Sequence, residues 1–270
     1  MTAPPLRPPL LALDLDGTLI AFEEPIRSAV VAAVRGAMAA GIRATIVTGR
    51  MVAATQPYAS VLGIAGTLVC YQGAVLADAA TGHFGREIPL ANAIALRAYE
   101  AGKAGGYHVQ FYANDRFYVE EVNEFSRLYA RVSGLEPVVV SSLREAFSSR
   151  DSTKVNLIMK PERTAACAEL MREVCGPEAY VTRSNPEFVE LLDPRVDKAE
   201  ALTRVAASYG IPMDRVLAIG DSYNDVPMLR AAGFSVAMGT AAAEVKAEAD
   251  AVVGGVDADG VAEAIERFVT

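Results

Sequence analysis

Leu10-Leu11-Ala12-Leu13-Asp14-Leu15-Asp16-Gly17-Thr18-Leu19 is the stretch that decides the fold. An apolar run without helical spacing ends at two acids two positions apart, and a Gly-Thr turn follows. This pattern predicts a buried parallel strand that delivers Asp14 and Asp16 to its carboxyl end, the edge where open α/β sheets carry their chemistry. Because such close carboxylates repel each other, keeping both ionised requires a cation between them or a shared proton. The plainer interpretation is a strand followed by an acidic turn.

Composition limits the possible functions. The chain has 270 residues, 52% of them hydrophobic, which is enough for a large core and for two domains. A formal net charge of −8 argues against a broad nucleic-acid surface, whereas a phosphorylated small molecule needs only a few local cations. Cys70, Cys167 and Cys175 match no zinc spacing, so we expect reduced thiols. With no apolar run of membrane length and no signal-like segment at 1–9, we expect a soluble cytoplasmic protein without membrane contact.

A β-α-β unit follows the opening strand. The apolar spacing predicts a helix over 25–41 with Pro25 at its first position, then a strand over 42–47 that ends in Thr48-Gly49-Arg50. We expect its crossover to be right-handed. A third strand over 67–71 ends in Gln72-Gly73-Ala74, and a turn at Thr81-Gly82 indicates a short hairpin.

The pattern changes between about 88 and 190. Alternating and aromatic residues predict an antiparallel hairpin over 107–112 and 117–119 around Asn114-Asp115. Further elements are expected as helices over 91–103, 122–132 and 161–174, and as strands over 154–159, 179–182 and 188–192. This mixture is typical of an inserted α+β domain. We therefore assign residues 1–86 and 191–270 to a core domain and residues 87–190 to the insert.

The βα alternation returns after residue 191. A helix over 198–209 leads to a buried strand over 216–219, which ends in Gly220-Asp221-Ser222-Tyr223-Asn224-Asp225. The remaining helices are expected over 226–232, 242–248 and 260–268, and the remaining strands over 235–237 and 251–253. The fold class is thus α/β, with a doubly wound, Rossmann-like parallel sheet.

Polar clusters end three of these strands: Asp14 with Asp16, Thr48-Gly49-Arg50, and Asp221 with Asn224 and Asp225. Parallel strands end at the same edge, so we expect the clusters to converge on one crevice. Four carboxylates there need a divalent cation, and an all-oxygen ligand set without His or Cys favours Mg²⁺. Lys198 and the Thr48 hydroxyl add donors for an anion.

These residues, in this order, resemble the four motifs of the haloacid dehalogenase-like superfamily: Asp14-Leu-Asp-Gly-Thr, Thr48 in Thr-Gly-Arg, Lys198 before a helix, and Gly220-Asp-x-x-Asn-Asp. The insert, the run Ala231–Gly239, and Glu244-Val-Lys-x-x-Ala-Asp250 resemble the Cof-type phosphatases. The resemblance implies a core with an α/β cap domain inserted between the second and third motifs. It also implies Mg²⁺-dependent hydrolysis of a phosphate monoester.

The resemblance further implies a role for each matched position. Asp14 is expected to be the nucleophile that forms an aspartyl-phosphate, and Asp16 the acid and base. Mg²⁺ is expected on the Asp14 carboxylate, the Asp16 backbone carbonyl and Asp221, with support from Asp225.

The phosphoryl oxygens have expected partners too. Thr48 and Lys198 are expected to hold them, and Asn224 lies nearby. Gly49, like Gly17, lets the backbone approach closely.

Two positions depart from the Cof pattern. Gln72 stands where the pattern usually has Asn, and Thr240-Ala241 stands where it often has Asn-Ala. Gln72 keeps the amide but moves it by one methylene, so the substrate and the loop contacts stay open. Neither departure touches the nucleophile or the metal positions.

Simpler roles remain for several residues. Lys198 could be a solvated lysine, Arg50 could pin its loop by a salt bridge or contact substrate, and Thr48 could be a helix N-cap. In the insert, residues on one face of the hairpin could reach the substrate, although aromatic residues there more often pack. The candidates are His108, Gln110, Tyr112 and Tyr118.

The first functional hypothesis is a Mg²⁺-dependent phosphatase of a small phosphorylated metabolite, such as a sugar phosphate or a phosphorylated cofactor. A phosphotransferase or mutase would use the same intermediate, and a silent sensor would keep only the fold. The presence of both Asp14 and Asp16 speaks against the sensor. We do not expect dehalogenase chemistry, because that branch does not need the acids at Asp221 and Asp225. A monomer or a homodimer is compatible with the sequence.

Overall fold

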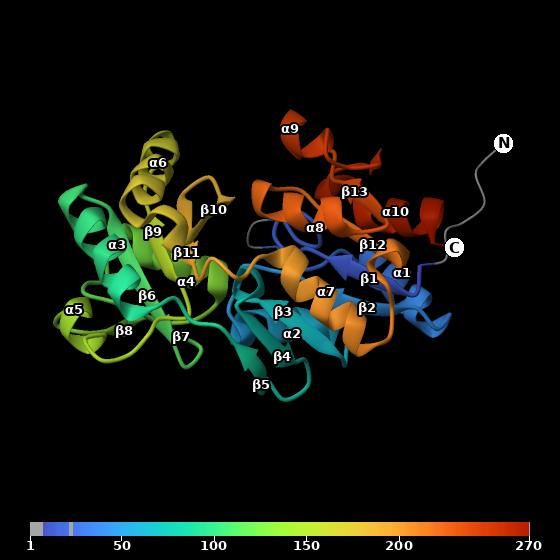
Figure 1. Cartoon of the computed structure of the whole chain (residues 1–270). Coiled ribbons are helices and arrows are strands. Elements are labelled where there is room, and N and C mark those ends of the chain that lie inside the picture. Colours follow the sequence, from blue (N-terminus) through green and yellow to red (C-terminus); the bar gives the residue numbers. More distant parts are fainter. Residues whose placement is uncertain (1–7, 22–23, 270) are drawn as a thin grey trace.

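The computed structural model describes residues 8–21 and 24–269 (Figure 1). The core domain is built on a parallel five-stranded sheet in the order β14-β13-β12-β1-β2. Its strands are β1 (Leu10–Leu13), β2 (Arg43–Ile46), β12 (Val216–Gly220), β13 (Phe234–Ala237) and β14 (Ala251–Val252). Because β1 pairs with β12 on one side and β2 on the other, the strand order reverses at β1, and the crevice of such a sheet opens there.

Helices cover both faces of this sheet. Leu11 and Leu13 of β1 pack into one apolar cluster together with residues of the helices α1 (Ser28–Ala39), α2 (Val52–Leu62) and α10 (Gly260–Phe268). Leu10 and Ala12 pack into the opposite cluster with α7 (Lys198–Ser208) and α8 (Val226–Ala231). The short helix α9 (Ala243–Lys246) lies beyond β13. The predicted doubly wound α/β fold is therefore confirmed.

A small antiparallel sheet extends the core. It is formed by β3 (Thr67–Cys70), β4 (Val75–Asp78) and β5 (Phe84–Glu87), and a single parallel bridge between Val47 and Val69 joins it to the end of β2. The predicted turn at Thr81-Gly82 connects β4 and β5. Strand β5 itself lay outside the sequence prediction, because its Phe-Gly-Arg-Glu sequence carries little apolar alternation.

The cap domain contains a six-stranded sheet in the order β10-β11-β9-β6-β7-β8. Its strands are β6 (His108–Ala113), β7 (Arg116–Val119), β8 (Val138–Val139), β9 (Val155–Ile158), β10 (Tyr180–Asn185) and β11 (Phe188–Leu192). The helices α3 (Asn92–Ala104) and α6 (Thr164–Cys175) pack together against one face, with α5 (Leu143–Ala146) near its edge. Helix α4 (Glu124–Ser133) follows the β6–β7 hairpin (Figure 1).

Alternation along the cap strands separates two faces. Val155 and Leu157 belong to the apolar cluster beneath α3 and α6, so their neighbours Lys154 and Asn156 face the other way. That second face also carries Tyr112 and Phe188, which belong to the cluster of the core domain. The cap sheet therefore turns a partly polar face toward the carboxyl end of β1.

Several predicted boundaries need correction. Helix α1 begins at Ser28 and has Arg27 as its N-cap, so Pro25 lies before the helix and not at its first position. Helix α9 covers four residues only, less than the predicted 242–248. Residues 1–7 lie outside the described residues. They form part of the segment in which we expect no signal peptide, and the sequence prediction assigns them to the core domain.

The cysteines agree with the expectation of reduced thiols. Cys70, Cys167 and Cys175 are buried and form no disulfide. Within residues 8–21 and 24–269, no helix combines the length and the apolar character required to cross a bilayer.

Candidate active site

Asp14 and Lys198 meet at the carboxyl end of β1, although 184 positions separate them. Asp14 directly follows Leu13 and is 4% exposed, while Lys198 is the first residue of α7 and 1% exposed. The Lys198 Nζ lies 2.6 Å from Asp14 Oδ1 and 2.5 Å from Asp225 Oδ1. The alternative of a solvated lysine is therefore wrong, and a buried cation sits between two carboxylates.

The loop after β12 positions Asp221 and Asp225. The Asp225 Oδ2 accepts the backbone N–H groups of Asp221 and Ser222, each at 3.0 Å. A Cβ on Gly220 would lie 2.7 Å from the Cβ of Asp225, so the strand must end in glycine. Gly17 faces the same loop with a φ of +82°, and a Cβ there would lie 2.3 Å from Asp221 Oδ2. The two glycines allow the loops after β1 and β12 to approach each other.

Asp14, Asp221 and Asp225 form one carboxylate cluster. Each offers an oxygen, and the three oxygens lie within 4.8 Å of one another. Burial raises the pKa of Asp14 well above its ordinary value, with repulsion from Asp225 second. Burial, again followed by repulsion from Asp225, raises the pKa of Asp221 to about 7. For Lys198, the two acids outweigh the effect of burial and raise its pKa.

This cluster fits a divalent cation. The Asp14 Oδ2 is buried and has no hydrogen-bond partner, which is costly unless a cation or a substrate satisfies it. The donors are all oxygens, the set that Mg²⁺ prefers. When all three carboxylates are ionised, Lys198 neutralises only one of them, and a net charge of minus two remains to be balanced.

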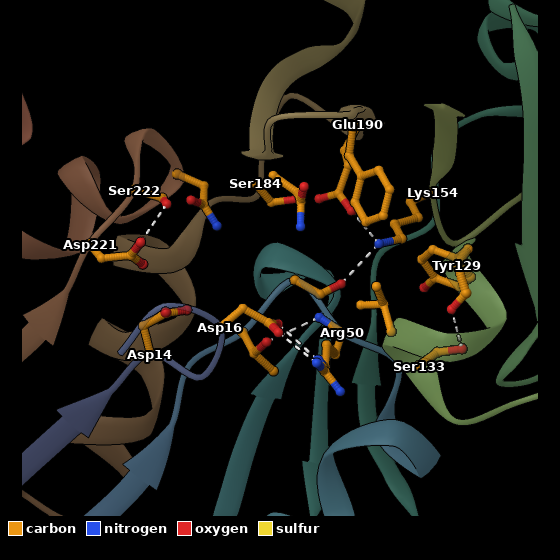
Figure 2. A pocket seen from close by; sticks show the side chains of 16 residues that line it. Asp14, Asp16, Arg50, Tyr129, Ser133, Lys154, Ser184, Glu190, Asp221 and Ser222 are labelled. Carbon is orange, nitrogen blue, oxygen red and sulfur yellow. Dashed lines mark hydrogen bonds and ion pairs between the residues drawn. The ribbon is translucent and has the colours of Figure 1, made fainter. Parts of the chain in front are cut away.

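Asp16 lies apart from that cluster and pairs with Arg50. The Arg50 Nε donates to Asp16 Oδ2 at 2.8 Å, and Nη2 lies 2.5 Å from Oδ1, a two-pronged ion pair (Figure 2). Arg50 is 8% exposed, whereas the Asp16 side chain is 35% exposed. Of the two roles considered for Arg50, the structure shows the salt bridge, and its partner is the predicted acid and base.

Thr48 does not cap the following helix. The N-cap of α2 is Met51 and has no side-chain hydrogen bond, and the Thr48 hydroxyl instead accepts the Arg50 backbone N–H at 3.1 Å. The N–H groups that begin α2 are bound from the cap domain: Asp115, in the β6–β7 turn, accepts those of Val52 and Ala53 at 2.9 and 2.7 Å.

Gln72 connects the two domains. It is fully buried, and its Oε1 accepts the Asn224 amide at 3.0 Å while its Nε2 donates to Glu190 of the cap at 2.5 Å. A Cβ on Gly49 would lie 2.2 Å from Gln72 Nε2, which explains the glycine there. The predicted phosphate-binding residue Asn224 lines the cavity, and its Oδ1 has no partner.

Lys154 and Glu190 are the site residues that the sequence reasoning missed. The Lys154 Nζ lies 2.5 Å from Glu190 Oε1 and donates to the Gly49 carbonyl at 2.9 Å. Both line the cavity above Asp16 (Figure 2). A charged residue within the apolar strand prediction 154–159 and another within 188–192 were the available signal, because buried charges are rare without a partner or a function.

The residues proposed to reach the substrate from the hairpin do not line this cavity. Tyr112 is buried and donates to Gln110 at 2.9 Å, and Tyr118 packs against Phe147 on the opposite face of the sheet. His108 lies in a different hollow, where burial lowers its pKa to about 4.

The cavity between the domains is small. Besides the residues above, Tyr129, Val132 and Ser133 of α4 and Ser184 of β10 line it (Figure 2). Its volume is about 30 Å³. Two contacts join cap and core beside it, Lys154 to the Gly49 carbonyl and Gln72 to Glu190.

Comparison with known proteins identifies the family. The family model described as haloacid dehalogenase-like hydrolase matches residues 11–265. The chain belongs to this family. A phosphoglycolate phosphatase of Methanothermobacter thermautotrophicus is 27% identical over 96% of the chain and 98% of its own length. A Bacillus subtilis 5-amino-6-(5-phospho-D-ribitylamino)uracil phosphatase is 28% identical over 96% and 95%.

Solved structures agree. A haloacid dehalogenase-like hydrolase from Bacteroides thetaiotaomicron matches with a TM-score of 0.83 and 27% identity, covering 96% of this chain and 98% of that one. The predicted superfamily, its Cof-type branch and the enzyme class, a phosphatase, are therefore confirmed. Hydrolases of this family generally use Mg²⁺, and the carboxylate cluster supplies a matching ligand set.

Proposed function

We propose that this enzyme hydrolyses a small phosphate monoester through an aspartyl-phosphate on Asp14. The observation that carries the proposal is the Asp14 carboxylate. One of its oxygens is bound by Lys198, and the other is buried with no partner in the carboxylate cluster. A nucleophile needs such a free, fixed oxygen, because orientation removes much of the entropic barrier to an in-line attack.

The reaction balances over two displacements. In the first, the Asp14 oxygen forms a bond to phosphorus while the bond to the leaving alcohol breaks, and Asp16 gives the alcohol oxygen its proton. In the second, water gives a proton to Asp16 and attacks phosphorus, which releases phosphate and restores Asp14. Asp16 therefore exchanges its contact with Arg50 for the leaving oxygen during the first step.

Other residues bind and orient the phosphoryl group. Asp14, Asp221 and Asp225, together with the Asp16 backbone carbonyl, would hold Mg²⁺, which supplies positive charge to the phosphoryl oxygens when bound. Lys198 adds a second positive charge at that position. Thr48, Gly49 and Asn224 lie along the same cavity and are the proposed contacts for the remaining oxygens.

The cap domain determines what enters. We propose that the insert, expected at residues 87–190, acts as a lid on the core domain, expected at 1–86 and 191–270. These bounds shift slightly in the structure, because β5 of the core ends at Glu87 and β11 of the cap ends at Leu192. In this structure the cap contacts the core at the Gly49 carbonyl and at Gln72, so the lid opens for a phosphate ester to enter and then closes to exclude water. A lid of this kind suits free metabolites such as sugar phosphates or phosphorylated cofactors, and relatives are named for phosphoglycolate and pyridoxal phosphate.

The surroundings of the protein are part of the proposal. The net charge of −8 and the absence of a spanning helix in the described segments support a cytoplasmic enzyme without nucleic-acid or membrane partners. A monomer and a homodimer both suit this role.

Phosphate release from a panel of phosphomonoesters, with Mg²⁺ or with excess EDTA, tests the proposal. We expect release that requires Mg²⁺ and is abolished by Asp14→Asn. The control is Asp78→Asn, which changes an exposed turn carboxylate bonded to Thr81. Release that survives EDTA or the Asp14 change would refute the mechanism, and phosphate appearing on an added sugar acceptor in place of water would indicate a transferase.

A further inference from the structure

The cavity above Asp16 is closed by a buried ion pair of the cap domain. The side chains of Lys154 and Glu190 are 1% and 2% exposed, and their Nζ and Oε1 atoms lie 2.5 Å apart. Glu190 lies in β11, and Lys154 directly precedes β9, the antiparallel neighbour of β11. Both line the cavity that holds Asp14 and Asp16.

Stability does not explain this pair. Removing two charges from water costs about as much as their attraction returns, so apolar residues would serve the cap equally well. The two residues also contact the core domain, Lys154 through the Gly49 carbonyl and Glu190 through Gln72. The pair is therefore placed where a leaving group would lie once the lid is closed, between the cap sheet and Asp16.

Gln72 explains how Glu190 is held. Its amide spans from Asn224 in the core to Glu190 in the cap, with contacts of 3.0 and 2.5 Å. An asparagine at position 72 would be shorter by one methylene. The length of Gln72 thus supplies the reach that fixes the Glu190 carboxylate toward the cavity.

The charges around the cavity are paired. Among the described residues that line it, the cations are Arg50 and Lys154, and each is bound by a carboxylate, Asp16 or Glu190. Asp14 and Asp221 add further negative charge. Lys198 is bound by two acids. A second anionic group placed beside Lys154 and Glu190 therefore meets no uncompensated cation there.

We propose that Glu190 determines specificity: by neutralising Lys154, it restricts the enzyme to phosphate esters whose leaving group carries no second negative charge. Hydroxyl groups of such a leaving group can donate to Glu190 and accept from Lys154. This inference rests on the proposed phosphatase function. It predicts a different substrate preference from that of the relative named for phosphoglycolate, because phosphoglycolate carries a carboxylate besides its phosphate.

Glycerol 3-phosphate and 3-phosphoglycerate form a matched pair of probes, because they differ in a terminal hydroxymethyl or carboxylate group. We expect wild-type kcat/KM to favour glycerol 3-phosphate at least about tenfold, the contribution of one charge-assisted hydrogen bond. Glu190→Gln leaves the Lys154 charge uncompensated and should shift the ratio about tenfold toward 3-phosphoglycerate. The double variant Glu190→Gln/Lys154→Met has neither charge and should keep the wild-type ratio within about threefold.

The control is Glu178→Gln, which changes a cap carboxylate paired with Arg97 at 2.8 Å, away from the cavity. It should leave both kcat/KM values unchanged. A wild-type preference for 3-phosphoglycerate, or a folded Glu190→Gln variant with the wild-type ratio, would refute the proposal. If Glu190→Gln does not fold, Lys154→Met decides: it leaves the Glu190 charge without its partner and should shift the ratio further toward glycerol 3-phosphate, and an unchanged ratio would refute the proposal.

Binding separates this inference from the phosphatase function. Calorimetric titration of both probes into Asp14→Asn protein with Mg²⁺, with and without Glu190→Gln, measures the same preference without turnover. If no ester is hydrolysed but the binding ratio shifts as expected, the phosphatase mechanism fails and the role of Glu190 stands. If hydrolysis occurs and neither ratio shifts, the role of Glu190 fails alone.

Discussion

Removing Mg²⁺ should make the stability of this enzyme depend on pH through Asp14 and Asp221, whose pKa values are both raised. In the metal-free protein, burial and then repulsion from Asp225 raise the pKa of Asp221 from 3.8 to about 7. An acid whose pKa is higher in the folded state binds its proton more tightly there. Its contribution to stability is therefore complete below about pH 4 and is lost as the pH rises through about 7.

The size of this effect follows from the same pKa. At about 1.36 kcal/mol per unit of pKa, the interval from 3.8 to about 7 corresponds to about 4 kcal/mol. For a chain of this length, that free energy lowers Tm by about 10 °C between acidic and neutral pH. Bound Mg²⁺ acts in the opposite sense, because it needs the deprotonated carboxylate and competes with the proton.

Scanning calorimetry at about pH 4, 5.5, 7 and 8.5, with EDTA or saturating MgCl₂, measures both effects. We expect the Mg²⁺-induced rise in Tm to be small at the acidic pH and to grow toward the alkaline one. Asp221→Asn should weaken the pH dependence of the metal-free Tm and remove most of the metal effect, while Asp78→Asn should leave both. A rise in Tm of equal size at every pH would refute the proposed ligand and its titration.

Three further predictions concern single side chains. Lys198→Met should lower kcat by about a hundredfold or more, because one preorganised positive charge that faces the phosphoryl group is lost. Steady-state kinetics on the folded variant measure this loss, and an unchanged kcat would contradict the prediction. Arg50→Met should slow hydrolysis of alkyl phosphates more than that of p-nitrophenyl phosphate, because the p-nitrophenyl leaving group needs little protonation by Asp16. Equal slowing of both substrates would contradict the role of Arg50 in positioning Asp16. Asp115→Ala removes an acceptor for two helix N–H groups and should lower the free energy of unfolding by about 1–2 kcal/mol in urea titrations. The control is Glu169→Ala, which removes an exposed carboxylate of the cap. An equal loss of stability in the control would contradict the prediction.

The core of the site was predictable from sequence because parallel strands end at a common edge. Asp14, Asp221 and Asp225 each follow a strand of one parallel sheet, and the structure brings them within 4.8 Å. Lys198 was found by its place in the motif order, and its burial between two acids was not evident from sequence. Asp16 followed from the same strand, but its ion pair with Arg50 depends on a side-chain direction that spacing does not encode.

The cap residues were not predictable in the same way. Alternation shows that Gln110 and Tyr112 share a face, but not whether that face reaches the cavity. The structure fills the space beneath them with Tyr129 and other apolar side chains. Lys154 and Glu190 enter the cavity from strands whose order in the cap sheet, β11-β9-β6, differs from their order in the chain. Such long-range pairing has no local sequence signal.

The loop at Thr48–Met51 links the position of the lid to the acid. Its Gly49 carbonyl accepts Lys154 from the cap, and its Arg50 side chain holds Asp16. The helix that follows has its first N–H groups bound by Asp115 of the cap. Opening the lid must break the contacts on both sides of Arg50, since both partners move with the cap. We infer that the closed lid fixes Arg50, and through it the place of Asp16 before Asp16 turns to the leaving oxygen, so that protonation of a leaving group is tied to exclusion of water.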